Sequence, residues 1–200
     1  MEAGLAVLYP GEATYEARVE SYWSRVAQLT PWCIVQPYSV IEVAQAVTAL
    51  VNANKTQQCQ FAVRSGGHST WAGAANIEDG VTIDLGMMNS TTYHAENNTA
   101  AILPGARWKS VYSILDAIGV AAAGGRASTV GVAGLVLGGG NSFYAGRKGM
   151  VCDNVVQFQV SFYRTDLCAE LSIDPTGRLL LAVVRSSMPT IKRTATSFRH

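Results

Sequence analysis

Short apolar runs alternate with stretches in which apolar residues recur at helical spacing, and this pattern predicts a mixed α and β structure. Buried strands are expected at residues 32–35, 61–64 and 81–85. An amphipathic helix is expected over residues 14–29, with charged residues between its apolar positions. The apolar face of this helix comprises Tyr15, Val19, Tyr22, Trp23 and Val26.

A second helix is predicted directly after the first strand. Pro37 ends that strand, and Ser39 with Glu42 forms a capping-box pattern, which satisfies the first free N–H groups of a helix. This helix is predicted to run to about Asn52. A strand–helix–strand unit places its two strands parallel, and we expect strands 32–35 and 61–64 to be neighbours.

Two cysteines lie near the starts of these two strands. Cys33 is in the first strand, and Cys59 comes just before the second. Neighbouring parallel strands that start at the same end of a sheet would bring the two Cα atoms within the roughly 4.4–6.8 Å that a disulfide requires. We therefore expect a Cys33–Cys59 disulfide, and the alternative is a pair of buried free thiols.

The middle of the chain reads as a β-hairpin followed by a helix. The hairpin is predicted from residues 92–95 and 99–103, with His94 as a surface residue. Gly119 is expected just beyond the end of the helix. The buried stripe of the helix comprises Trp108, Val111, Tyr112, Leu115 and Ile118. For Trp71, in the loop before strand 81–85, we expect a place that caps the core, and the alternative is a place near a bound ligand.

Composition limits the possible classes of protein. The chain has 200 residues, of which 48% are hydrophobic and 14% charged, so it can bury a core as one globular domain. A net charge of +1 gives no argument for a nucleic-acid partner or for an anionic membrane surface. No apolar run approaches the ~18 residues of a membrane span, and we expect no signal peptide in the first residues, which include an acidic residue and only a short apolar stretch.

The strongest candidate for a ligand-binding segment is residues 64–69, Arg-Ser-Gly-Gly-His-Ser. Two glycines directly after a predicted strand allow positive φ and a close approach to a ligand. Successive N–H groups in such a turn can form a nest for phosphate oxygens, and His68 would lie beside the bound group. Residues 124–142 are dense in glycine and read as a second ligand loop, although neither the Rossmann nor the P-loop pattern fits them.

Several motifs, in order along the chain, resemble the berberine bridge enzyme-like oxidases. These are RSGGHS at residues 64–69, PWCIVQP at 31–37, VTIDLG at 81–86 and STVGVAGLVLGGG at 128–140. The resemblance covers residues 9–160 and implies an α+β fold, namely a PCMH-type FAD-binding domain made of two α/β subdomains. The substrate domain of the family is missing from this chain, and residues 161–200 form a divergent tail of uncertain structure.

The resemblance implies that the cofactor is FAD, bound covalently through His68. Family members with a second covalent bond carry a cysteine where this chain has Ala127. No metal site and no catalytic base is assigned. The helix-opening turn at Gly105 has an alternative interpretation as a plain strand-to-helix turn. The residues that match cofactor-binding positions of the family are Arg64, Ser65, Gly66, Gly67, His68, Ser69, Gly105, Gly125, Thr129, Gly131, Gly134, Gly138, Asn154 and Val155.

The implied function is that of an FAD-dependent oxidoreductase. It would oxidise a small molecule, such as a sugar, an alcohol or a secondary metabolite, by hydride transfer to the flavin, with O2 as the expected electron acceptor. One alternative is a truncated flavin-binding fragment without turnover, because the substrate domain is missing. Another is a secreted interaction domain without flavin, favoured by glycosylation sequons at Asn54, Asn89 and Asn97. Many relatives are secreted, but this chain itself does not indicate its compartment.

Overall fold

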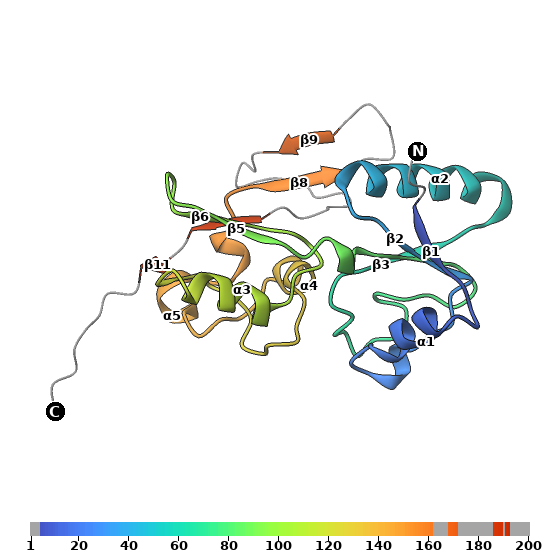
Figure 1. Cartoon of the computed structure of the whole chain (residues 1–200), viewed down its shortest axis with the longest axis horizontal. Helices are drawn as coiled ribbons and strands as arrows, with labels where there is room; N and C mark the ends of the chain where they lie inside the picture. The colour runs from blue at the N-terminus through green and yellow to red at the C-terminus, as the bar shows by residue number, and fades with distance from the viewer. Residues whose placement is uncertain (1–4, 162–167, 172–185, 190, 193–200) are drawn as a thin grey trace, which may run out of the picture.

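The computed structural model describes residues 5–161, 168–171, 186–189 and 191–192. Its first subdomain is a four-stranded sheet, with helices α1 (Ala13–Glu20) and α2 (Val40–Gln57) on opposite sides (Figure 1). No helix in the described ranges combines the length and the apolar character that crossing a bilayer requires. The strands of this sheet, in spatial order, are β1 (Ala6–Leu8), β2 (Cys33–Gln36), β4 (Val81–Asp84) and β3 (Phe61–Arg64).

Strand β4 lies between β2 and β3 and runs parallel to both. Val81 is the partner of Cys33 on one side and of Phe61 on the other. All four residues of β4 are buried, as expected for a strand in the interior of a parallel sheet. The expectation that β2 and β3 are neighbours is therefore wrong, because β4, from later in the chain, separates them.

The expected disulfide between Cys33 and Cys59 is not present in the structure. Cys33 and Cys59 are free thiols in the structure. Cys33 lies in β2, and Cys59 comes two residues before β3 begins at Phe61. Both side chains pack against the core between α2 and the sheet, and burial raises the pKa of the Cys33 thiol.

Helix α2 begins with the predicted capping box. The backbone N–H of Glu42 donates to Ser39 Oγ at 3.2 Å, and the N–H of Tyr38 donates to Glu42 Oε2 at 2.8 Å. The helix continues past Asn52 to Gln57 and ends where Gln58 takes a φ of 51°. Its inner face packs on the sheet in a core that comprises Val35, Val43, Ala46, Val47, Val81, Ile83, Leu85 and Met88.

Helix α1 is shorter than its sequence pattern predicts. It ends at Glu20 rather than near residue 29, and only a short 3-10 turn, Arg25–Ala27, follows. The reason is a tertiary contact, because the N–H of Trp23 donates to the carbonyl of Gly67 at 3.0 Å instead of to a helical carbonyl. Tyr22 turns inward, whereas Trp23 is 64% exposed. This segment therefore attaches to the candidate ligand turn.

The second subdomain confirms the predicted hairpin and the following helix. The hairpin turns at Asn98, whose φ is 55°, and His94 lies at its surface beside Glu96. The elements are β5 (Thr91–His94), β6 (Thr99–Ile102), α3 (Trp108–Asp116), β7 (Val120–Ala121), α4 (Val132–Leu137), α5 (Ala145–Lys148) and β8 (Phe158–Ser161). Three further strands pair with them: β9 (Cys168–Leu171) with β8, β10 (Ser186–Pro189) with β6, and β11 (Ile191–Lys192) with β7.

Helix α3 supplies the centre of the second core. Trp108, Val111 and Leu115 are fully buried, as their spacing predicts. Ile118 is 52% exposed, because the helix ends at Asp116 and the chain then turns. Each subdomain therefore has its own core, one around α3 and one under α2, and the candidate site lies between the two subdomains.

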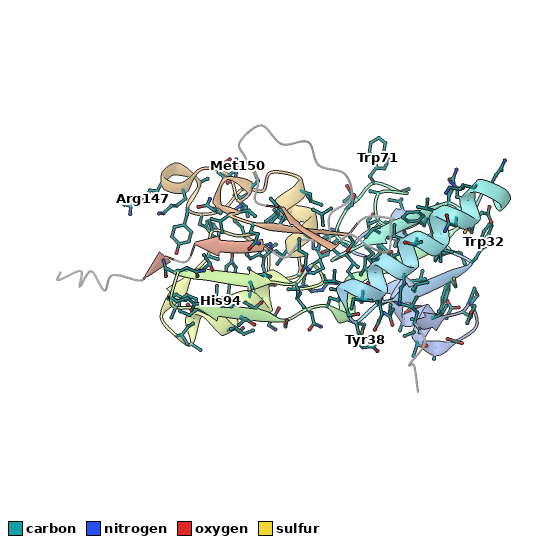
Figure 2. The ribbon with its side chains drawn as sticks, turned by 90° about the horizontal axis from the view of Figure 1, so that it is seen from above. Trp32, Tyr38, Trp71, His94, Arg147 and Met150 are labelled. Atoms are coloured by element: carbon teal, nitrogen blue, oxygen red, sulfur yellow. The ribbon has the colours of Figure 1, made fainter. Side chains whose placement is uncertain are left out.

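Trp71 contradicts its predicted place in the core. Its side chain is 79% exposed and projects from the surface (Figure 2). The interior position under this loop belongs to Asn76, whose amide donates to the carbonyls of Ala27 and Leu29 and accepts from the Thr82 hydroxyl. A polar side chain with three hydrogen bonds therefore closes this part of the core.

Candidate functional site

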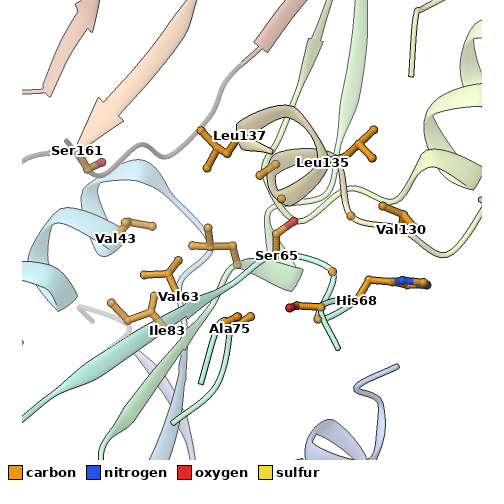
Figure 3. Close-up of a pocket in the computed structure, with 18 of the residues that line it drawn as sticks. Val43, Val63, Ser65, His68, Ala75, Ile83, Val130, Leu135, Leu137 and Ser161 are labelled. Atoms are coloured by element: carbon orange, nitrogen blue, oxygen red, sulfur yellow. The ribbon is translucent and has the colours of Figure 1, made fainter. Parts of the chain in front are cut away.

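A cavity of about 630 Å³ lies between the two subdomains. Figure 3 shows side chains from α2, β3 and β4 on one side and α4 with its preceding loop on the other. Val43, Val63 and Ile83 give the first wall an apolar surface. The residues that follow β3 line the cavity next to this wall, so the glycine turn and the apolar surface belong to one site.

Residues 65–69 form a tight turn at the end of β3. Gly67 has a φ of 63°, in the left-handed region that favours glycine. The backbone N–H groups of residues 66–69 have no hydrogen-bond acceptor among the residues that the structure describes. The turn is anchored from its other atoms, since Ser65 Oγ donates to the carbonyl of Pro104 at 2.6 Å. This arrangement leaves a row of N–H donors for an anion.

The second glycine-rich loop packs directly on this turn. A Cβ at Gly66 would lie 2.5 Å from the backbone N of Gly131, and a Cβ at Gly131 would lie 2.4 Å from the N of Gly66. The two backbones can approach this closely only because both residues are glycine. Helix α4 begins just beyond the contact, and a Cβ at Gly134 would meet nothing within 4 Å, so this position is open toward the cavity.

His68 is held by residues from two other segments. Its Nε2 lies 3.0 Å from Thr129 Oγ1, and its ring stacks on Trp23 with a centroid separation of 4.5 Å and an interplanar angle of 13°. Burial, and then the positive charge of Arg107, lower the pKa of His68 below its usual value. The ring is therefore neutral at pH 7 and has a fixed orientation.

A cluster of charged residues supports the turn from behind. Arg64 is fully buried and donates to the carbonyl of Arg18 at 2.7 Å and to Ser21 Oγ at 2.8 Å. Its guanidinium carbon lies 3.8 Å from the centroid of the Tyr22 ring. Arg18 forms two hydrogen bonds with Asp84. Burial alone would raise the pKa of Asp84, but Arg18 and Arg64 outweigh burial and hold that pKa below its usual value.

Arg107 joins the turn to the second loop. Its guanidinium donates to the carbonyl of Gly66 at 2.9 Å and to the carbonyl of Thr129. Arg107 is not among the residues predicted from the sequence, because an arginine before the first turn of a helix has no distinctive pattern. The stacking of Trp23 on His68 was not predicted either, because the helical spacing of Trp23 indicated a packing role. The only sequence signal for Arg107 is its place directly after the turn at residues 104–106.

The comparisons with known proteins agree with this geometry. The model of the FAD binding domain family matches residues 31–165. The chain belongs to this family. It is 45% identical over 157 residues to the FAD-dependent monooxygenase sdcF of Emericella nidulans, which covers 78% of this chain and 32% of the relative. It is 37% identical over 158 residues to an uncharacterised FAD-linked oxidoreductase of Arthroderma benhamiae, which covers 78% of this chain and 31% of that protein.

Solved structures identify the fold of this FAD-binding domain. The TM-score is 0.80 to 6-hydroxy-D-nicotine oxidase of Arthrobacter nicotinovorans, at 23% identity, covering 94% of this chain and 42% of that structure. It is 0.78 to berberine bridge enzyme, at 19% identity, covering 95% of this chain and 41% of that one. The expected PCMH-type fold is confirmed. The chain spans about a third of the length of the curated relatives it matches.

The structure divides the predicted FAD-contacting residues into two groups. Seven line the cavity: Ser65, Gly66, Gly67, His68, Ser69, Gly131 and Gly134. The others lie outside its wall: Arg64, Gly105, Gly125, Thr129, Gly138, Asn154 and Val155. Thr129 still contacts the site through His68. For both groups, contact with the cofactor itself stays a prediction.

Several residues of the second group have a packing role. A Cβ at Gly105 would lie 2.0 Å from the carbonyl oxygen of Leu85, and a Cβ at Gly125 would lie 2.5 Å from Trp108 Cδ1. These glycines are therefore required by neighbouring protein atoms, whether or not a ligand is bound. The side-chain amide of Asn154 donates to two carbonyls of its own loop, at 2.9 and 2.8 Å.

The residues of the cavity fit FAD. The free N–H groups of residues 66–69 match the negative oxygens of a pyrophosphate. The cluster behind them has three arginines, Arg18, Arg64 and Arg107, against the single carboxylate of Asp84, which favours an anion. The apolar wall suits flat ring systems. Ser161 Oγ is buried in the cavity wall without a partner in the described ranges, so a polar ligand atom could satisfy it.

Proposed function

We propose that the turn at residues 65–69 binds the pyrophosphate of FAD and that His68 forms a covalent bond to the flavin. The row of N–H donors at residues 66–69, next to a neutral histidine in the same cavity wall, carries this proposal. One solved neighbour supports the covalent bond, since glucooligosaccharide oxidase of Acremonium strictum is described with an 8α-N1-histidyl FAD. That neighbour is 23% identical to this chain, with a TM-score of 0.78.

The role of His68 in this attachment is that of a nucleophile. A neutral imidazole with a nitrogen lone pair is required, and the lowered pKa of His68 keeps the ring in that form at pH 7. Thr129 and the Trp23 ring fix its orientation. In the overall step, a bond forms between a ring nitrogen and the flavin 8α carbon. One hydrogen leaves that carbon, one leaves the imidazole, and O2 takes both, with two electrons, as hydrogen peroxide.

For the whole protein we propose oxidation of a small molecule, such as a sugar, an alcohol or a secondary metabolite, with O2 as electron acceptor. When bound, FAD supplies the redox chemistry, and this chain supplies its binding and orientation. The names of the relatives and neighbours support this class of activity, since they include FAD-dependent monooxygenases and oxidases. The second candidate is FAD binding without turnover by this chain alone, because it spans only 32% of sdcF.

The two glycines at positions 134 and 146 offer a matched test of FAD binding. Both lie in helices, and a Cβ at either would meet nothing within 4 Å, but only Gly134 lines the cavity. Replacing a helical glycine by alanine stabilises by about 0.5–1 kcal/mol. We expect Gly134→Ala and Gly146→Ala to keep or gain stability, measured by urea denaturation.

FAD affinity should separate the two variants. In a titration followed by flavin fluorescence, Gly134→Ala should weaken binding at least about tenfold, or about 1.4 kcal/mol, because its methyl group takes space at the ligand. Gly146→Ala should bind like the unmodified chain. Equal affinities for all three proteins would place FAD elsewhere. Substrate-dependent O2 consumption by a full-length version would then separate an oxidase from a binding fragment.

A further inference from the structure

Arg107 has a position that FAD binding by residues 65–69 does not itself explain. It does not line the cavity, yet it donates to one carbonyl in each of the two loops that do, at Gly66 and at Thr129. Neither carbonyl accepts another hydrogen bond within the described ranges. Arg107 also forms an antiparallel bridge with Gly131 through its backbone. One residue therefore connects the helix α3 start to both loops.

The first carbonyl belongs to a peptide that has a second role. The C=O of Gly66 and the N–H of Gly67 are parts of the same peptide unit, and in a trans peptide these two groups point in opposite directions. When Arg107 holds the carbonyl from behind, the N–H is directed away from Arg107. That N–H is one of the free donors of the turn. The guanidinium thus orients and polarises a group that we assign to phosphate binding.

The second carbonyl belongs to the residue that contacts His68. Thr129 Oγ1 lies 3.0 Å from His68 Nε2, so the position of the Thr129 backbone determines where the histidine ring is held. A planar guanidinium can donate to two acceptors in a fixed geometry, whereas a lysine ammonium is a point charge. Arg107 therefore fixes the distance between the turn and the residue that orients its histidine.

We propose that Arg107 is a positioning residue for flavin attachment, because it holds the carbonyls of Gly66 and Thr129 together and so keeps the phosphate-binding turn and His68 in register. This inference rests on the proposed function, namely FAD binding at residues 65–69 with a bond to His68. It assigns to Arg107 no contact with FAD. Its effect acts through the two loops.

Three variants of the full 200-residue chain test the inference. Arg107→Met removes the charge and both hydrogen bonds. Arg107→Lys keeps the charge but loses the planar guanidinium that donates to two acceptors in a fixed geometry. Lys109→Met is the matched control, since Lys109 is exposed in the first turn of α3, two residues after Arg107, and its loss removes one charge. Each protein is incubated with saturating FAD in air. The rate of flavin attachment to the folded protein is measured from flavin that stays with the acid-precipitated pellet.

Both Arg107 variants should attach flavin at least about tenfold more slowly than the unmodified chain, and Lys109→Met should attach it at the same rate. A normal rate in Arg107→Lys would overturn the inference, because charge alone would then suffice. A purely structural role would lower the thermal midpoint without a change in rate per folded molecule. If Arg107→Met does not fold, the attachment rate of Arg107→Lys by itself tests the inference.

A second measurement separates this inference from the proposed function. In the His68→Ala background, which cannot form the bond, FAD affinity reports on the orientation of the turn alone. We expect Arg107→Lys to weaken FAD binding there severalfold, and an unchanged affinity would count against the inference. The absence of FAD binding by the folded unmodified chain would instead overturn the proposed function, and with it the inference. FAD binding and attachment that are equal in all variants would overturn the inference only.

Discussion

Asp84 neutralises the charge cluster behind the ligand turn, so its replacement should destabilise the fold strongly. Its carboxylate is fully buried, accepts two hydrogen bonds from Arg18, and accepts a third from Gln36 Nε2 at 2.9 Å. Asp84→Asn preserves the shape of the side chain but leaves Arg18, and the fully buried Arg64, without a counterion. An uncompensated buried charge is the costly outcome of breaking such a pair.

The structure sets the size of this effect. Removal of one partner of a buried ion pair costs about 3–5 kcal/mol. The side chain of Arg18 is 23% exposed, so it can regain part of its hydration, and we expect a loss near the lower limit, about 3 kcal/mol. Urea denaturation followed by tryptophan fluorescence measures this loss as a lower transition midpoint.

Two further variants make the measurement decisive. The exposed pair His94–Glu96 has side-chain exposures of 32% and 70%, so Glu96→Gln should change the unfolding free energy by less than about 0.5 kcal/mol. The double variant Asp84→Asn with Arg18→Met should be more stable than Asp84→Asn alone, because it removes the unpaired cation. A loss below about 1 kcal/mol in Asp84→Asn would refute the reasoning.

Three other predictions follow from the same structure. Gly105→Ala should destabilise the protein by about 1–3 kcal/mol in urea denaturation, because its Cβ would lie 2.0 Å from the Leu85 carbonyl oxygen. An unchanged midpoint would show that the surrounding backbone relaxes without cost. Ser39→Ala should lower the unfolding free energy by about 1 kcal/mol, because the N-cap hydrogen bond of α2 is lost. The control is Ser113→Ala, at an exposed serine on α3. Equal denaturation midpoints for the two variants would contradict a stabilising role of the Ser39 cap. The folded-state pKa of Asp84 lies below its unfolded value. The contribution of Asp84 to stability is therefore present above the unfolded pKa and is lost as pH falls through the folded pKa. The unfolding free energy, measured as pH is lowered, should accordingly fall less steeply in Asp84→Asn than in the unmodified chain.

The sequence predicts the local features of this protein well. The capping box of Ser39 and Glu42 and the hairpin around Asn98 depend on residues close together in the chain, and the structure contains both. The position of the ligand turn could be found for the same reason. Two adjacent glycines after a predicted strand permit the positive φ and the close approach to a ligand that most other residues disfavour.

Features that depend on distant partners could not be predicted in this way. Helix α1 ends early because Trp23 donates to Gly67, which lies more than forty positions later. Strand β4, from later in the chain, enters the sheet between β2 and β3, so the two strands of the predicted strand–helix–strand unit are not neighbours. Arg107 was missed because its role arises only when two glycine loops meet at its side chain.

The central claim is that residues 65–69 hold FAD and that His68 bonds to it. Its most direct test is the absorption spectrum of the purified 200-residue chain, incubated with FAD, before and after acid precipitation. The account predicts flavin bands in the folded protein that stay with the pellet, and a His68→Ala variant whose flavin is released to the supernatant. Release of all flavin from the unmodified chain would contradict the covalent bond. Folded protein that takes up no flavin would contradict the site itself.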